Sequence, residues 1–78
     1  MSPEEVARLI RAGLLGAQVQ VESDDHTHFN ARVVAREFAQ LRTLARHQLV
    51  YRTLGELVGR EIHALSIEAL TPEESGQG

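Results

Sequence analysis

The feature that most constrains this chain is the absence of cysteine from a sequence of only 78 residues. Neither disulfide bonds nor a cysteine-ligated zinc ion can hold such a fold together, so it must rest on one hydrophobic core. Hydrophobic residues make up 42% of the sequence, which argues against disorder. We therefore expect a single domain over residues 1–74, with residues 75–78 as a flexible tail.

Two features bear on where the protein resides. No apolar run approaches the roughly 18 residues that a membrane-spanning helix needs. The opening residues Ser2-Pro3-Glu4-Glu5 are acidic, whereas a secretory signal begins with basic residues. We therefore expect a cytoplasmic protein without a membrane segment.

The first element is predicted to be a helix. Ser2, Pro3 and Glu5 fit the N-cap, the first helical position and the third position of a capping box. Apolar residues then recur at helical spacing as far as residue 14. Either Gly13 or Gly16 can end this helix, and Gly16 is the better stop.

Strict alternation of apolar and polar residues follows over residues 17–22 and again over 28–35. This period of two predicts two strands, each with one apolar face and one polar face. Residues 23–27 are polar and typical of a turn, and the connection is short. The two strands should therefore form an antiparallel hairpin.

The second half of the chain is predicted to hold a short helical turn over residues 36–41 and a longer helix over 43–58. Thr43 is its expected N-cap. The apolar stripe of the longer helix comprises Leu44, His47, Val50, Tyr51, Leu54, Leu57 and Val58. A third strand is expected over residues 62–70. Thr71 and Pro72 are able to start a last helix, which residues 75–78 cannot continue.

This order of elements predicts an α+β two-layer sandwich, with a three-stranded mixed sheet and helices on one face. A helix connects the second strand to the third, so these two should run parallel if they are neighbours. Parallel neighbours begin at the same edge of a sheet. His26, His28 and His63 stand at or near the two strand starts, so we expect three of the four histidines at one rim.

Histidines gathered in this way have two interpretations. They can bind a transition metal, or share an iron–sulfur cluster with the ligands of another protein, and Asp24 and Asp25 can then orient a ligating imidazole. Alternatively, they are ordinary polar residues of loops. No compact metal motif is present, and the set is too small for a closed site, so a partner or solvent would have to complete it.

The middle of the chain is basic. Residues 32–52 carry five arginines against one glutamate, a net charge of +4 in a chain whose overall charge is -3. Such a segment can bind nucleic acid or an acidic partner, or it is simply a solvated helix face. The candidate nucleic-acid-binding residues are Arg36, Arg42, Arg46, His47 and Arg52. For His47, the alternative is a histidine at the edge of the core, bonded to backbone.

Features of enzymes are missing from the sequence. It has no evident pair of catalytic carboxylates, no nucleophile elbow and no glycine loop able to cradle a phosphate. The chain also has few aromatic side chains that could stack on nucleic-acid bases, since it contains one tyrosine and two phenylalanines. We expect a protein that is not an enzyme, and a metal-free protein-interaction domain remains a third alternative.

Blocks of residues along nearly the whole chain resemble the BolA family. They are His28-Phe29, Val33-Val34, Phe38, Arg46-His47-Gln48-Leu49-Val50-Tyr51, Leu54, Ile62-His63-Ala64-Leu65-Ser66-Ile67 and Thr71-Pro72-Glu73-Glu74. The resemblance covers residues 2 to about 74. The short hairpin loop is most similar to the group of bacterial acid-stress BolA homologues. Two departures are Ala39-Gln40 in place of a family glycine, and Ser75 in place of a tryptophan.

The resemblance implies an αββ(α)αβ(α) fold related to KH domains of the second type. It implies two roles: binding a 2Fe–2S cluster jointly with a monothiol glutaredoxin and glutathione, or binding DNA as a transcriptional regulator in bacteria under stress. In the first role His63 is a cluster ligand, and either His26 or His28 is the second. The cluster is shared with the partner and not expected in the isolated protein, which should be a monomer or a weak homodimer.

Overall fold

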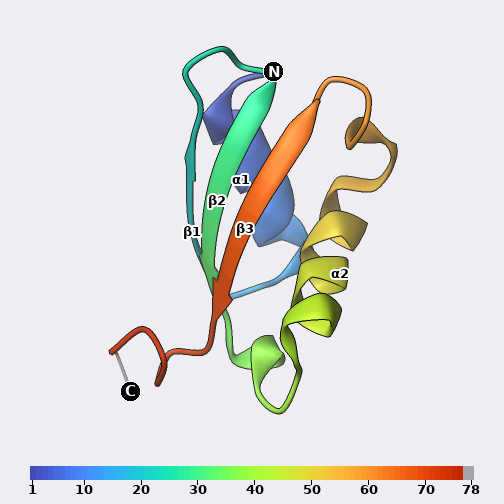
Figure 1. Ribbon diagram of the computed structural model, residues 1–78. Helices are drawn as coiled ribbons and strands as arrows, with labels where there is room; N and C mark the ends of the chain where they lie inside the picture. Colours follow the sequence, from blue (N-terminus) through green and yellow to red (C-terminus); the bar gives the residue numbers. More distant parts are fainter. Residues whose placement is uncertain (77–78) are drawn as a thin grey trace.

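The computed structural model describes residues 1–76 and has two layers, a three-stranded sheet and a pair of helices (Figure 1). In chain order the elements are α1 (Pro3–Gly13), β1 (Gln18–Glu22), β2 (His28–Val34), α2 (Thr43–Leu54) and β3 (Ala64–Leu70). This arrangement confirms the predicted α+β architecture. Neither helix is long and apolar enough to cross a membrane.

The sheet has the order β1-β2-β3, with β2 in the centre. β1 and β2 are antiparallel, with Val19 opposite Val33, and β2 and β3 are parallel, with His28 opposite Ala64. Both predicted pairings are therefore confirmed. β2 and β3 begin at the same end of the molecule and run side by side (Figure 1).

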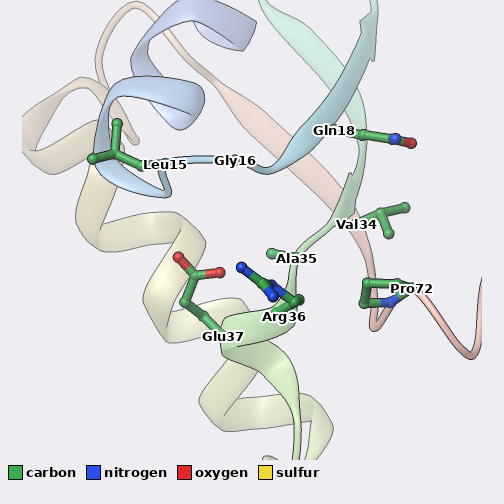
Figure 2. A pocket seen from close by; sticks show the side chains of 8 residues that line it. All are labelled: Leu15, Gly16, Gln18, Val34, Ala35, Arg36, Glu37 and Pro72. Atoms are coloured by element: carbon green, nitrogen blue, oxygen red, sulfur yellow. The ribbon is translucent and has the colours of Figure 1, made fainter. Parts of the chain in front are cut away.

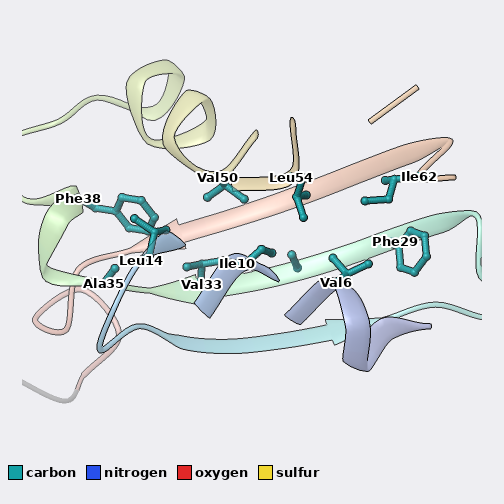
Figure 3. Close-up of a cluster of buried hydrophobic side chains, with 11 residues drawn as sticks. Val6, Ile10, Leu14, Phe29, Val33, Ala35, Phe38, Val50, Leu54 and Ile62 are labelled. Atoms are coloured by element: carbon teal, nitrogen blue, oxygen red, sulfur yellow. The ribbon is translucent and has the colours of Figure 1, made fainter. Parts of the chain in front are cut away.

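One hydrophobic core joins the two layers. Alternate residues of β2 point into it from the sheet, and residues of α1 and α2 meet them from the same side (Figure 3). Its buried members are Val6, Ile10, Leu14, Phe29, Ala31, Val33, Ala35, Phe38, Val50, Leu54 and Ile62. The predicted inward face of the second strand is thus confirmed, because its period of two matches the pleat of the sheet.

The start of α1 follows the sequence prediction, and its end falls at the less favoured of the two predicted stops. The Ser2 hydroxyl accepts a hydrogen bond from the Glu5 N–H at 3.1 Å, and the Glu5 carboxylate accepts one from the Ser2 N–H at 2.9 Å. The helix ends at Gly13 rather than at Gly16. Gly16 has a φ of +85° and lies in the turn towards β1, so the helix must stop before it.

The predicted boundaries of α2 are also corrected. Thr43 is the first helical residue rather than the N-cap, which is Arg42. The helix ends at Leu54 and not at residue 58, because Gly55 takes a φ of +59° and begins a 3₁₀ turn, Gly55–Leu57. A second 3₁₀ turn, Arg36–Phe38, precedes the helix and agrees with the short helical turn expected within residues 36–41.

The segment after β3 forms a turn. The Thr71 hydroxyl accepts a hydrogen bond from the Glu74 N–H at 3.2 Å, and the Glu74 carboxylate accepts one from the Thr71 N–H at 2.9 Å. This is a capping box, yet no helix follows it within residues 1–76. Ser75, expected in the flexible tail, donates to the Pro72 carbonyl at 2.8 Å. Residues 77–78 of that predicted tail lie outside the described residues.

Candidate metal centre

His28 and His63 meet at one rim of the sheet. The Thr27 carbonyl, just before β2, accepts hydrogen bonds from the His63 N–H at 2.7 Å and from the Ala64 N–H at 3.2 Å. These bonds tie the start of β3 to the start of β2. The convergence predicted from parallel strand starts is therefore present for these two histidines.

The two imidazole rings lie close together and both residues are exposed. Their centroids are 5.7 Å apart, and the ring planes are inclined by 46°. Two imidazoles that bind one tetrahedral ion at about 2.1 Å place their centroids roughly 5 Å apart. The pair is therefore close to the separation that shared ligation of one metal requires, and its donors face solvent, where a partner's ligands can reach them.

Asp25 holds the ring of His28. Its carboxylate oxygen Oδ2 lies 2.7 Å from the imidazole Nδ1, while Oδ1 accepts the backbone N–H groups of His28 at 2.9 Å and Thr27 at 3.0 Å. These backbone donors, followed by the imidazole, hold the pKa of the Asp25 carboxyl well below its usual value. With Nδ1 engaged, Nε2 is the nitrogen that His28 offers to a metal.

His26 lies at the tip of the loop. It has a φ of +60°, and its N–H donates to the Ser23 hydroxyl at 2.9 Å. Its ring contacts no other histidine ring among residues 1–76. The structure therefore pairs His28, and not His26, with His63. Asp24, the other predicted orienting carboxylate, makes no hydrogen bond or ion pair within the described chain.

The rim does not form a complete metal site. Within the part of the chain that the structure describes, no group of three or more histidine, cysteine or acidic side chains is placed to hold a metal ion. Two imidazoles with an orienting carboxylate are half of a four-ligand set. A metal bound here would need its remaining ligands from another molecule.

Sequence reasoning missed two residues of this loop. The Ser23 hydroxyl donates to the His28 carbonyl at 2.6 Å, which closes the loop beside the histidine. The Thr27 carbonyl ties the loop to β3, as described above. Ser and Asp shortly before a strand are typical of side-chain-capped turns, so Ser23 had a detectable signal. The Thr27 carbonyl had none, because it belongs to the backbone.

Arg46, one of the predicted nucleic-acid-binding residues, is engaged inside the chain. Its guanidinium donates to the carbonyls of Leu41 at 2.8 Å and Ala69 at 3.0 Å. It also bonds both carboxylate oxygens of Glu74, at 2.6 and 3.0 Å. This pairing lowers the pKa of Glu74 to about 2 and raises the pKa of Arg46. The Arg46 side chain is only 14% exposed, and it links α2 to β3 and to the segment that follows β3.

The other predicted nucleic-acid-binding residues remain accessible. Arg36, Arg42 and Arg52 are exposed and take part in no ion pair among residues 1–76. His47 is half-buried, but its ring makes no hydrogen bond in the described chain, so the expected backbone bond is a wrong prediction. Arg36, Arg42 and Arg52 are therefore accessible to an external anion, whereas Arg46 is bonded within the chain.

A hollow of about 420 Å³ lies at the opposite end of the sheet, where β2 and β3 finish. Leu15, Val34 and Pro72 line it, together with the oppositely charged Arg36 and Glu37 (Figure 2). No histidine lines this hollow. The hollow is therefore separate from the histidine rim. Its two charged lining residues, Arg36 and Glu37, carry opposite charges.

Comparison with known proteins identifies the family. The model of the family described as BolA-like protein matches residues 12–74. "Protein BOLA1, chloroplastic" from Arabidopsis thaliana is 42% identical over 59 residues, covering 76% of this chain and 37% of that protein. "DNA-binding transcriptional regulator BolA" from Vibrio cholerae is 43% identical over 60 residues, covering 68% of this chain and 57% of that protein. The chain thus spans about half the length of these relatives or less.

A solved structure agrees with the sequence comparison. The BolA homologue from Coxiella burnetii superposes with a TM-score of 0.87 and 36% identity, covering 97% of each chain. The names of these relatives are those of a regulator and of BolA proteins, and not of enzymes, in agreement with the prediction that the chain is not an enzyme. On the family match and the shared fold, this chain belongs to the BolA family.

Proposed function

We propose that this protein is an adaptor that binds a 2Fe–2S cluster jointly with a monothiol glutaredoxin and its glutathione, for iron–sulfur trafficking or for iron, redox or stress regulation. His63 and His28 are the ligands that this chain contributes. The observation that carries the proposal is the pair of exposed imidazoles whose centroids lie 5.7 Å apart.

The chemistry of the donor set supports this assignment. Two histidines are able to replace two cysteines on one iron of a 2Fe–2S cluster. The chain has no cysteine, so every thiolate must come from the partner or from glutathione. The Asp25 carboxylate on Nδ1 of His28 keeps Nε2 available as the ligating nitrogen, an arrangement common among metal-binding histidines.

Visible circular dichroism of cluster-loaded glutaredoxin tests the proposal. Adding this protein should change the spectrum, because new ligands alter the chirality around the cluster. We expect His63→Ala and His28→Ala to abolish the change. His26→Ala and His47→Ala are matched controls, because they remove the two histidines outside the paired rings, and they should leave the change intact.

A spectrum that does not respond to this protein would exclude the adaptor role. If His26→Ala rather than His28→Ala abolished the response, the ligand assignment would be wrong while the shared cluster would stand. Far-ultraviolet circular dichroism of each variant checks that the fold is retained, which is expected because both rim residues are exposed.

A second candidate function is DNA binding. The relative from Vibrio cholerae is named a DNA-binding transcriptional regulator, and Arg36, Arg42 and Arg52 are exposed without ion-pair partners in residues 1–76. Three phosphate contacts would give a log affinity that falls with log salt at a slope of about −3. Arg46 and His47 are not part of this set, because Arg46 is bonded to Glu74 and His47 is half-buried.

A mobility-shift assay at two salt concentrations tests this candidate. Replacing Arg42 and Arg52 together by glutamine should weaken binding uniformly across sequences and reduce the salt slope by about two. Arg8→Gln, an exposed arginine on α1, is the matched control. An affinity that is indifferent to the double substitution would rule out this surface as the DNA contact.

A further inference from the structure

The paired imidazoles of His28 and His63 lie at one end of the molecule, where β2 and β3 both begin (Figure 1). The His28 side chain is 60% exposed even though it is bonded to Asp25, and His63 is exposed as well. Neither residue belongs to the hydrophobic core. A second molecule can therefore approach both rings from this end without disturbing the packing between sheet and helices.

The spacing of the two rings favours a tetrahedral metal ion. Their centroids are 5.7 Å apart, against roughly 5 Å for two imidazoles on one tetrahedral ion and about 4.5 Å for neighbouring imidazoles on a square-planar one. Small rotations of exposed side chains are enough to close the smaller difference. Zinc prefers tetrahedral sites with nitrogen ligands, whereas magnesium and calcium prefer oxygen. The geometry therefore points to zinc among the common divalent ions.

The number of nitrogen donors points to a second copy of the chain. A closed zinc site has four protein ligands, and this rim supplies two. No third histidine or acidic side chain joins them to form a metal-binding group within residues 1–76. A second copy carries an identical pair, and a two-fold axis through the metal would bring the four imidazoles together. Each half of the site is then incomplete without the other.

We propose that one zinc ion bridges two copies of this protein through His28 and His63 of each copy. The inference shares its ligands with the proposed function, but it requires neither a glutaredoxin nor a cluster. The Asp25 carboxylate on Nδ1 of His28 leaves Nε2 to bind the zinc. Because the same imidazoles cannot bind zinc and a cluster at once, the bridged dimer and the glutaredoxin complex would exclude each other.

The charge around the rim makes this dimer dependent on the metal. Glu22, Asp24 and Asp25 line a hollow of about 210 Å³ beside His28, and the whole chain has a net charge of -3. These carboxylates attract a divalent cation and repel the same surface of another copy. We therefore expect separate chains in the absence of zinc and paired chains in its presence.

Sedimentation velocity of the untagged protein with added zinc chloride tests the proposal. We expect the mass of one chain without zinc and of two chains with it. Isothermal titration calorimetry should saturate at one zinc ion per two chains. A chelator should restore the single chain, and magnesium chloride at the same concentration should leave it unchanged, because magnesium binds imidazole poorly.

Substitutions identify the ligands. His28→Ala and His63→Ala should each abolish the doubling of mass, because they remove half of the donors from each side. Asp25→Asn should weaken zinc binding at least tenfold, since loss of an orienting partner costs about 10–100-fold in metal affinity. His26→Ala and His47→Ala are matched controls that remove the other two histidines, and they should leave both the mass and the affinity unchanged.

Four results would overturn the proposal. They are a single-chain mass at saturating zinc, a doubled mass without zinc, a zinc dimer that survives His63→Ala, and loss of the dimer in His26→Ala. The glutaredoxin spectrum separates this inference from the proposed function. A protein that stays single in zinc but still changes that spectrum refutes the zinc bridge alone, whereas a zinc dimer that leaves the spectrum unchanged refutes the adaptor role alone.

Discussion

Asp25 determines how the hairpin loop presents His28. One of its oxygens receives two backbone N–H groups and the other lies 2.7 Å from the imidazole Nδ1. The same carboxylate therefore closes the turn and selects the ring tautomer in which the proton is on Nδ1. Asp24, one residue earlier, has neither role in the described chain.

We predict that Asp25→Asn reverses the tautomer of His28. The amide nitrogen of asparagine would donate to Nδ1 and drive the ring proton to Nε2, while its oxygen still accepts the backbone N–H groups. Long-range ¹H–¹⁵N correlation of the imidazole should show Nε2–H as the main tautomer in the variant and Nδ1–H in the parent. Asp24→Asn is the control, and an unchanged ring spectrum in Asp25→Asn would disprove the coupling.

At the scale of elements, α1 and α2 meet at Gly13 and Thr53. A Cβ placed on Gly13 would lie 2.5 Å from the Thr53 Cγ2 and 2.9 Å from its Cβ, far inside normal contact distances. The Thr53 hydroxyl is itself held at 2.6 Å by the Val50 carbonyl, so the side chain cannot rotate away freely. Glycine here permits the close approach of the helices.

Gly13→Ala should therefore destabilise the protein. The clash outweighs the better helix propensity of alanine, and we expect a net loss of about 1 kcal/mol in the free energy of unfolding. Thr53→Ser removes Cγ2 and keeps the hydroxyl, so it should recover at least half of that loss when combined with Gly13→Ala. Urea denaturation of the two single variants and the double variant measures this, and additive effects would contradict the contact.

Element boundaries show where sequence reasoning reached its limit. The alternation over β1 and β2 was enough to identify strands and their inward faces, because side chains on a strand alternate strictly. The apolar pattern of α2 was not enough. It included Leu44 and Tyr51, which are exposed, because helical spacing predicts where an apolar stripe lies on the helix and not how much of its width the sheet covers.

At the scale of the whole molecule, the Arg46–Glu74 pair links α2 to the segment that follows β3. The guanidinium also bonds the Ala69 carbonyl on β3. Because the paired state lowers the pKa of Glu74 to about 2, ionised Glu74 stabilises the fold fully above its ordinary value of 4.5. This contribution is lost as the pH falls from 4.5 through about 2.

Glu74→Gln tests this link. We expect a lower free energy of unfolding than in the parent at pH 7, and a difference that shrinks as the pH is lowered from 4.5 towards 2. Denaturant titrations at four or five pH values measure it. Glu73→Gln is the matched control, because Glu73 is exposed and forms no ion pair in residues 1–76. A constant difference across this pH range would contradict the assigned role.

Local periodicity and connection length were sufficient to predict the order of elements, the inward face of the sheet and the convergence of two strand starts. The position of His28 rather than His26 beside His63, and the bonding of Arg46 within the chain, became apparent only in the folded protein. Both outcomes depend on contacts between residues far apart in the chain, Thr27 with His63 and Arg46 with Glu74. No local pattern specifies such contacts, because chain folding brings the partners together.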